Sequence, residues 1–541
     1  MTRVRPLLMF MAWSVVTPVG AAPASRVPAA EAERPLVTLS QGVLRGVVDD
    51  GVEVFRGIPY AAPPVGEWRW RPPQPAPGWR GVRDAAAFGP VCPQLLREGY
   101  SRETLTGRPM SEDCLHLSVW TTSTRPDTPR PVMVWLLPGG YTVGDAGMER
   151  YDGRALAREG VVVVNFNYRL GMLGVFAHPA LSRAQAGEPL GNYNLMDQMA
   201  ALRWVRANIA AFGGDPANVT IFGMSAGGMS SNYLMASPAA TGLFDKAISE
   251  SSALRIRRER HLSQDQPGLP SLETEGRTIA ERVGIEGDDA GTIRALRALT
   301  MQQILDYQAK HGVGVSGGLG PVIDGRILVQ PVGEAFRSGA QQKVPYLTGA
   351  TSWEASLVSR NTPAAPVLGV ISVTRAEADA LYGEPDDHAL NNKIYSEFFL
   401  STQRYFAQAH ARAGQRSYVY VFSRVLDAHR GETFGAPHGA TTRYVFGTLD
   451  GAAIFEGPGN PGNFGYRVGP LDRAYANLVR GYWVQFAKTG DPNGEGRPGW
   501  PALTPGNDLL LEFGQQAPQV RRDYHAEAWR FFERHFEAGK P

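Results

Sequence analysis

The sequence predicts an α/β protein built on one mostly parallel sheet with helices on both faces. Short apolar runs bounded by Gly and Pro alternate along the chain with longer segments of helical periodicity. This alternation is expected when each strand is followed by a helix that covers the sheet. Long stretches separate the later strands and predict large insertions rather than separate domains. We therefore interpret residues 25–541 as a single domain.

The expected elements follow in order along the chain. Residues 131–137 (PVMVWLL) and 161–167 (VVVVNFN) are Val-rich runs typical of strands that are buried on both faces. Residues 195–212 place apolar side chains every three or four positions, which predicts an amphipathic helix ended by Gly213 and Gly214. Further strands are expected at 219–223, 344–349 and 417–422, and further helices at 391–412 and 471–488.

Composition excludes several classes of protein. The 541 residues carry a formal net charge of +2, with 43% hydrophobic and 20% charged residues. These values are ordinary for a globular protein with an ample core. A chain so close to neutral generates no long-range field that would recruit nucleic acid or an anionic membrane. We therefore expect no nucleic-acid partner.

The first 24 residues have the three-part pattern of a secretory signal peptide. Two arginines precede the apolar run 7–16, and small residues follow it. The run is too short to span a bilayer, and no later stretch approaches 18 uninterrupted apolar residues. We expect cleavage near Ala22 or Ala24 and export to the periplasm or the medium. An uncleaved or merely disordered apolar N-terminus is the alternative.

The chain has two cysteines, Cys92 and Cys114, which enclose residues 93–113. In an oxidising compartment an isolated pair at this spacing predicts a disulfide, and two buried free thiols are the alternative. Neither cysteine belongs to a cluster with the spacing of metal ligands, so no metal site is expected.

Residues 219–230 (VTIFGMSAGGMS) contain a candidate nucleophile. Gly223, Ser225 and Gly227 form a G-x-S-x-G pattern where a strand is expected to pass into a helix. The glycines let the backbone turn sharply and expose the serine hydroxyl, while the Ala226 amide faces any oxyanion formed there. The same five-residue pattern also arises by chance in a chain with 62 glycines, so a plain strand-to-helix junction is the alternative.

A neutral serine needs a base, and the base needs an orienting acid. His438, in GAPHGA, follows an expected strand and short loop, where an imidazole would stand above the sheet. Glu354 follows the expected strand 344–349 by a few residues. A satisfied loop histidine and a solvated loop carboxylate are the alternatives. We interpret His410, in a helical pattern, and His429, in a charged loop, as surface residues.

Gly139 and Gly140 follow the expected strand 131–137 and are candidate oxyanion donors. Glycine permits close approach to the backbone, and each of the two residues offers an N–H group. A turn that merely needs glycine is the alternative.

Taken together, these segments resemble the type-B carboxylesterase family, the α/β-hydrolases that include the cholinesterases. The similarity covers nearly the whole mature chain. The segments that carry it are residues 55–66, 111–120, 167–174, 197–223, 437–447 and 487–503.

The resemblance implies an active site and an activity. The implied site residues are a triad of Ser225, Glu354 and His438, backbone donors at Gly139, Gly140 and Ala226, and a disulfide between Cys92 and Cys114. The implied activity is hydrolysis of a small-molecule carboxylic ester through an acyl-enzyme, without a metal or organic cofactor. A related serine acyl hydrolase (a lipase, amidase or thioesterase) and a non-catalytic binding protein of the same fold are the alternatives. A monomer and a homodimer are both compatible with the sequence.

Three departures from the family pattern bear on the substrate. Met224 stands where the family usually has a glutamate, which makes the pocket less polar, although drift at a tolerant position is an equal alternative. Leu137 and Pro138 replace the usual His-Gly; proline has no N–H, but the expected donors are the two glycines that follow it. Residues 93–113 contain no Trp, and cation recognition requires an electron-rich ring face. We therefore expect uncharged, fairly apolar esters rather than choline esters.

Overall fold

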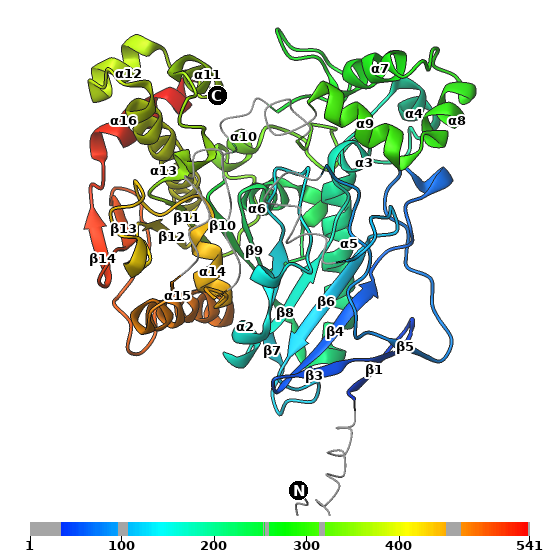
Figure 1. Cartoon of the computed structure of the whole chain (residues 1–541), viewed down its shortest axis with the longest axis horizontal. Coiled ribbons are helices and arrows are strands. Elements are labelled where there is room, and N and C mark those ends of the chain that lie inside the picture. Colours follow the sequence, from blue (N-terminus) through cyan, green and yellow to red (C-terminus); the bar gives the residue numbers. More distant parts are fainter. Residues whose placement is uncertain are drawn as a thin grey trace, which may run out of the picture. The chain divides into compact units, whose positions relative to one another are not determined.

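An eleven-stranded mixed sheet forms the centre of the protein and confirms the predicted α/β class (Figure 1). In pairing order its strands are β14 (Pro518–Arg522), β13 (Leu509–Phe513), β12 (Ser417–Phe422), β11 (Tyr346–Thr351), β10 (Lys246–Glu250), β9 (Gly214–Met224), β7 (Arg130–Leu136), β8 (Val162–Phe166), β6 (His116–Thr121), β4 (Val52–Pro59) and β3 (Val47–Asp49). Every pair from β13 across to β8 is parallel, whereas the strands outside this block pair antiparallel. A separate small sheet holds β1 (Leu36–Leu39), β2 (Gly42–Arg45) and β5 (Val82–Asp84).

This computed structural model describes residues 34–95, 107–252, 254, 259–312, 320–450 and 467–538. The expected signal peptide, residues 1–24, lies outside these ranges. The described residues from Pro35 onward form one compact unit. Within the described ranges, no helix is both long and apolar enough to cross a membrane.

Helices cover both faces of the sheet, and two adjacent residues of β10 show which helix lies on which face. Ser249 Oγ donates to the Gly228 carbonyl of α6 (Ala226–Ala236) at 2.9 Å. Glu250 instead accepts a hydrogen bond at 2.9 Å from Trp483 of α15 (Pro470–Thr489). Because neighbouring side chains point to opposite faces of a strand, α6 and α15 lie on opposite faces.

The other helices belong to these two layers or to the insertions. Thr348 pairs in register with Ser249 and donates to Gln403, which places α13 (Asp387–Arg412) on the α6 face. The remaining helices are α2 (Arg154–Arg158), α3 (Gly171–Gly174), α4 (Pro179–Ala184), α5 (Tyr193–Asn208), α7 (Leu272–Arg282), α8 (Ala290–Ala298), α9 (Met301–His311), α10 (Val332–Arg337), α11 (Ala364–Val370), α12 (Arg375–Tyr382), α14 (Ala440–Phe446) and α16 (Ala526–Glu537).

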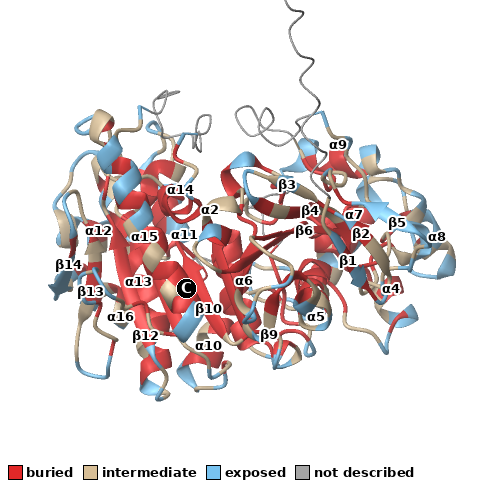
Figure 2. Cartoon of the chain, turned by 90° about the horizontal axis from the view of Figure 1, so that it is seen from below, coloured by how far each residue is buried: buried red, intermediate tan, exposed pale blue. Residues whose placement is uncertain are grey.

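The core lies along the central strands. Every residue of β8, β10, β11 and β12 is buried. Figure 2 shows the buried ribbon, in red, around β10 and α6. Burial on both faces is the rule for parallel strands that lie between helix layers, and it accounts for their apolar, Val-rich sequences. A rigid sheet of this kind fixes the positions of the loops that leave its carboxyl ends.

Candidate active site

Ser225 occupies a sharp turn between β9 and α6. Its φ of 57° and ψ of −121° are rarely adopted by a residue with a side chain. Two backbone hydrogen bonds hold this conformation: the Ser225 amide donates to the Glu250 carbonyl at 2.9 Å, and the Ser225 carbonyl accepts from Met229 at 2.8 Å. Ser225 is half-buried, whereas residues 221–224 and 226–236 are buried. The turn therefore leaves the serine as the accessible residue of this segment.

Close backbone contacts require the glycines around Ser225. A Cβ atom on Gly227 would overlap the Leu136 carbonyl oxygen, and one on Gly223 would lie 2.5 Å from the Gly227 carbonyl carbon. Gly228 is equally constrained, because its Cβ would lie 2.5 Å from the Glu250 carbonyl oxygen. The beginning of α6 is thus packed directly on the ends of β7 and β10.

Gly139 and Gly140 follow β7 with φ angles of 108° and 61°, and both are half-buried. The contact of Gly227 with the end of β7 brings this loop against the beginning of α6. Among the described residues, the amides of Gly139, Gly140 and Ala226 donate to no backbone carbonyl. Three backbone N–H groups in this arrangement are suited to stabilising an oxyanion.

His438 and Glu354 are joined by a hydrogen bond between Nδ1 and Oε2, and both side chains are fully buried. The other Glu354 oxygen accepts from the Thr351 amide at 2.7 Å and from Ser251 Oγ at 2.6 Å. The His438 amide donates to Ser356 Oγ at 2.9 Å. This burial and bonding exclude a solvated loop carboxylate at Glu354.

The strand order brings these residues to one edge of the sheet. Ser225 follows β9, Glu354 follows β11 and His438 lies in the loop after β12, and all three strands belong to the same parallel block. A Cβ atom on Gly439 would lie 2.7 Å from Cε of Met224, so the residue before the serine touches the residue after the histidine. A nucleophile, an imidazole and a carboxylate at strand carboxyl ends can carry out acyl transfer.

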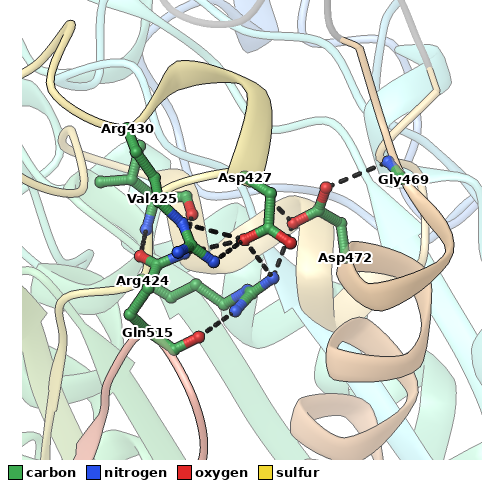
Figure 3. A network of polar contacts seen from close by, with 7 residues as sticks. All are labelled: Arg424, Val425, Asp427, Arg430, Gly469, Asp472 and Gln515. Carbon is green, nitrogen blue, oxygen red and sulfur yellow. Dashed lines mark hydrogen bonds and ion pairs between the residues drawn. The ribbon is translucent and has the colours of Figure 1, made fainter.

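A polar network secures the loop between β12 and His438 (Figure 3). The buried Arg424 donates to Asp472 of α15 at 2.7 Å and to Asp427 at 3.3 Å, and it also bonds the Gln515 carbonyl. Asp472 in turn accepts from the Gly469 amide at 3.0 Å, at the beginning of α15. The start of the loop that carries His438 is therefore tied to α15 and to the turn between β13 and β14.

The structure joins Cys92 and Cys114 in a disulfide. Gln94, within the bridged segment, donates to the Cys92 and Gly144 carbonyls at 3.0 Å each and accepts from the Gly144 amide at 2.9 Å. Gly144 belongs to the loop that begins with Gly139. The disulfide segment thus supports the loop that offers the candidate oxyanion donors.

The interpretation of His410 and His429 as surface residues is wrong, because both are buried. His410 contacts Gln341 and the Val344 carbonyl at 2.8 Å each, and burial lowers its pKa to about 4. Its helix, α13, packs on the sheet instead of facing solvent. Among the described residues, no group of three or more His, Cys, Asp or Glu side chains is arranged to hold a metal ion.

Sequence reasoning missed the two serines that orient the histidine and the carboxylate. Ser251 follows β10 and Ser356 lies two residues after Glu354. Ser251 reaches Glu354 across 103 positions of sequence, and no local pattern marks such a contact. Its place at the carboxyl end of β10 gave no signal either, because β10 was not among the expected strands.

Comparison with known proteins places this geometry in a family. The sequence pattern that defines the Carboxylesterase family matches residues 33–382 and 376–532. The chain belongs to the carboxylesterase family. As expected from that family, its fold is the α/β-hydrolase fold, and the protein is a carboxylic ester hydrolase.

Individual relatives match this carboxylesterase over most of its length. It is 34% identical over 492 residues to the fumonisin B1 esterase of Sphingopyxis macrogoltabida, covering 88% of this chain and 85% of the relative. It is 34% identical over 488 residues to the para-nitrobenzyl esterase of Bacillus subtilis, covering 86% of this chain and 92% of the relative. The solved structure of a thermophilic PNB esterase has a TM-score of 0.79 at 30% identity, covering 92% of this chain and 99% of that one.

Proposed function

We propose that this carboxylesterase hydrolyses uncharged, fairly apolar esters through an acyl-enzyme formed on Ser225. The hydrogen bond between His438 Nδ1 and Glu354 Oε2 is the observation that carries the proposal. A carboxylate at Nδ1 fixes the imidazole in the tautomer whose Nε2 is free of hydrogen and can accept a proton. The strained turn at Ser225 supports the assignment of that residue as the nucleophile.

The reaction proceeds in two stages. Ser225 Oγ attacks the ester carbonyl carbon while His438 takes the hydroxyl proton, and the imidazolium then protonates the leaving alcohol. In the second stage His438 takes a proton from water, which attacks the carbonyl carbon of the acyl-enzyme. The bond between that carbon and Ser225 Oγ then breaks, the imidazolium returns the proton to Oγ, and the acid leaves. Glu354 stabilises the imidazolium in both stages. The amides of Gly139, Gly140 and Ala226 stabilise the tetrahedral oxyanion, by about 3 kcal/mol per donor.

The side chain before the serine supports the proposed substrate class. Met224 is buried against Gly439 and places a thioether where a carboxylate would attract cations. A related enzyme that acts on para-nitrobenzyl esters supports aromatic esters as assay substrates. We propose a small-molecule ester as the partner and no cofactor, so EDTA is expected to leave turnover unchanged.

Para-nitrophenyl esters from acetate to decanoate test the proposal. Ser225→Ala is expected to lower turnover by at least about 10⁴-fold, because no other group supplies the nucleophile. Ser231→Ala is the matched control, since Ser231 lies on the same helix and donates to the carbonyls of Gly227 and Ile248. Equal turnover by Ser225→Ala and wild type would refute the serine mechanism. A folded wild type that cleaves no ester and resists fluorophosphonate labelling would instead be a binding protein.

We also propose that the chain is exported and that residues 1–24 are removed. The Cys92–Cys114 disulfide supports this proposal, because such bonds persist in oxidising compartments. Intact-mass measurement of the mature protein tests it. A mass that retains all 24 residues would contradict the cleavage.

A further inference from the structure

Glu250, the last residue of β10, is a buried acid that the proposed mechanism does not use. Its side chain is 0% exposed. One carboxyl oxygen accepts a hydrogen bond from Trp483 Nε1 at 2.9 Å, and the other has no hydrogen-bond partner among the described residues. No positive charge in the described part of the chain offsets its burial.

Glu250 lies directly behind the nucleophile. Its backbone carbonyl accepts the Ser225 amide at 2.9 Å and also limits the space at Gly228. In the sheet Glu250 pairs with Met224 on one side and with Gly349 on the other. Any movement of Glu250 is therefore transmitted to the strained turn at Ser225.

The side chain of Glu250 faces an aromatic and hydroxyl cluster on the α15 side of the sheet. Tyr420 of β12 lies in the same row, beyond Gly349, and the centroid of its ring lies 5.3 Å from that of Trp483. Among the described residues, Tyr420 is a titratable group whose pKa depends on the charge of Glu250. Its pKa also depends on Glu354, on Tyr346 and on an interaction with Thr441 of α14. Burial, followed by the charge of Glu250, raises the pKa of Tyr420 well above its ordinary value, so this phenol stays neutral.

These surroundings disfavour a charge on Glu250. Burial raises its pKa from an ordinary 4.5 to about 8, while the Trp483 bond acts in the opposite direction. At neutral pH the carboxyl group is therefore protonated. Above that range hydroxide removes the proton as water and leaves an anion behind the turn. That anion opposes the negative charge that develops on the substrate oxygen, and hydrating it requires the packing to open.

We propose that Glu250 is a positioning residue that supports catalysis at Ser225 only while its carboxyl group carries a proton, so that alkaline pH inactivates the enzyme through this residue. The proposal rests on the proposed role of Ser225 as nucleophile. It assigns a function to a carboxylate outside the triad. It also predicts that kcat/KM falls as pH rises into the alkaline range, and we call this part of the pH profile its falling limb.

The test compares kcat/KM between about pH 6 and 10 for wild type and Glu250→Gln. The amide keeps the acceptor for Trp483 and replaces the acid proton with an N–H that does not ionise. Wild type is expected to lose about tenfold per pH unit above about pH 8, as a single ionisation requires. Glu250→Gln is expected to hold its plateau. The control Glu334→Gln, which removes an exposed carboxylate on α10, is expected to follow wild type.

Trp483→Phe tests the same ionisation from the other side. This variant removes the one hydrogen bond that stabilises the Glu250 anion, so its falling limb is expected to move to higher pH. A loss of packing alone would not move the limb in this direction. If Glu250→Gln fails to fold, Trp483→Phe decides the question.

Two outcomes would overturn the proposal. One is an alkaline fall in kcat/KM that is the same in both variants as in wild type. The other is a loss of wild-type activity at about pH 9 that does not reverse on return to about pH 7. Fluorophosphonate labelling at neutral pH separates the two proposals. Unlabelled Ser225 in active wild type refutes the proposed function. Labelled Ser225 with unchanged limbs refutes the role of Glu250 alone.

Discussion

Replacing Cys92 and Cys114 together with alanine is expected to destabilise the fold while leaving the chemistry intact. The bridge joins residues at a sequence separation of 22. A closed loop of this length restricts the unfolded chain by an amount equivalent to about 3 kcal/mol at room temperature. Because the restriction acts on the unfolded chain, the double variant can retain every hydrogen bond of the site.

The melting temperature converts this free energy into an observable. A folded chain of about 500 residues has an unfolding entropy on the order of 1 kcal/mol/K. A loss of about 3 kcal/mol therefore lowers Tm by about 3 °C. Urea unfolding followed by tryptophan fluorescence measures the free energy directly, and kcat in buffer measures the site.

Gln94→Ala provides the matched comparison, because it keeps the bridge and removes the bonds to Gly144. Misplacing the Gly139–Gly140 loop is expected to lower kcat by about tenfold to 100-fold, with a smaller loss of stability than the double variant shows. A double-alanine variant as stable as wild type would refute the loop-entropy reasoning. A double variant with the kcat defect of Gln94→Ala would show that the bridge acts in the folded site instead.

Four further predictions test other parts of the structure. Glu354→Gln is expected to lower kcat by about 10⁴-fold with the fold intact by circular dichroism, because an amide holds His438 in the wrong tautomer; undiminished turnover would contradict this. Gly227→Ala is expected to abolish folding or activity, because the new Cβ overlaps the Leu136 carbonyl, whereas Gly369→Ala, in open space on α11, is tolerated; equal behaviour in expression and assay would contradict the contact. Arg424→Ala leaves Asp472 buried and unpaired and is expected to lower the unfolding free energy in urea by about 3–5 kcal/mol; a loss under about 1 kcal/mol would show that the network contributes little. The pKa of Glu250 is raised, so the folded protein holds a proton that the unfolded chain releases, and the free energy of unfolding falls as pH rises from about 4.5 to 8. Glu250→Gln is expected to flatten this pH dependence and to raise the free energy of unfolding at pH 8 by up to about 5 kcal/mol. Urea unfolding at a series of pH values measures it, and a pH dependence equal to that of wild type would contradict the prediction.

Strong periodicity was enough to predict much of the fold. The expected strand 417–422 coincides with β12, and the expected strand 161–167 contains β8. The expected helix 391–412 begins earlier, at Asp387, because Asp386 caps it by accepting from the Ala389 amide at 2.8 Å. The expected helix 195–212 is α5 followed by a tighter turn, Ile209–Phe212, before Gly213. Boundaries differ where caps rather than apolar spacing decide them.

Elements with charged residues in buried places were not predicted. β10, with the sequence KAISE, is buried at every position although it begins with Lys246 and ends with Glu250. Period-based reasoning assigns such a segment to the surface. The carboxyl of Glu250 is buried because β9, β11 and α15 surround it, and that information lies in tertiary structure. Short edge strands such as β3 were not predicted for a related reason, because three residues are too few to show an alternation of apolar and polar side chains.

The backbone contacts that hold Ser225, Glu354 and His438 have a consequence for how this protein can diversify. The proposed chemistry depends on strand ends, whereas α7–α9 and α11–α12 belong to excursions between strands. Substitutions or changes of length in those excursions leave the pairing register of the parallel strands, from β13 across to β8, unchanged. A directed-evolution library confined to residues 272–311 and 364–382 therefore varies the excursions while every residue of the proposed triad and of its oxyanion donors stays unchanged.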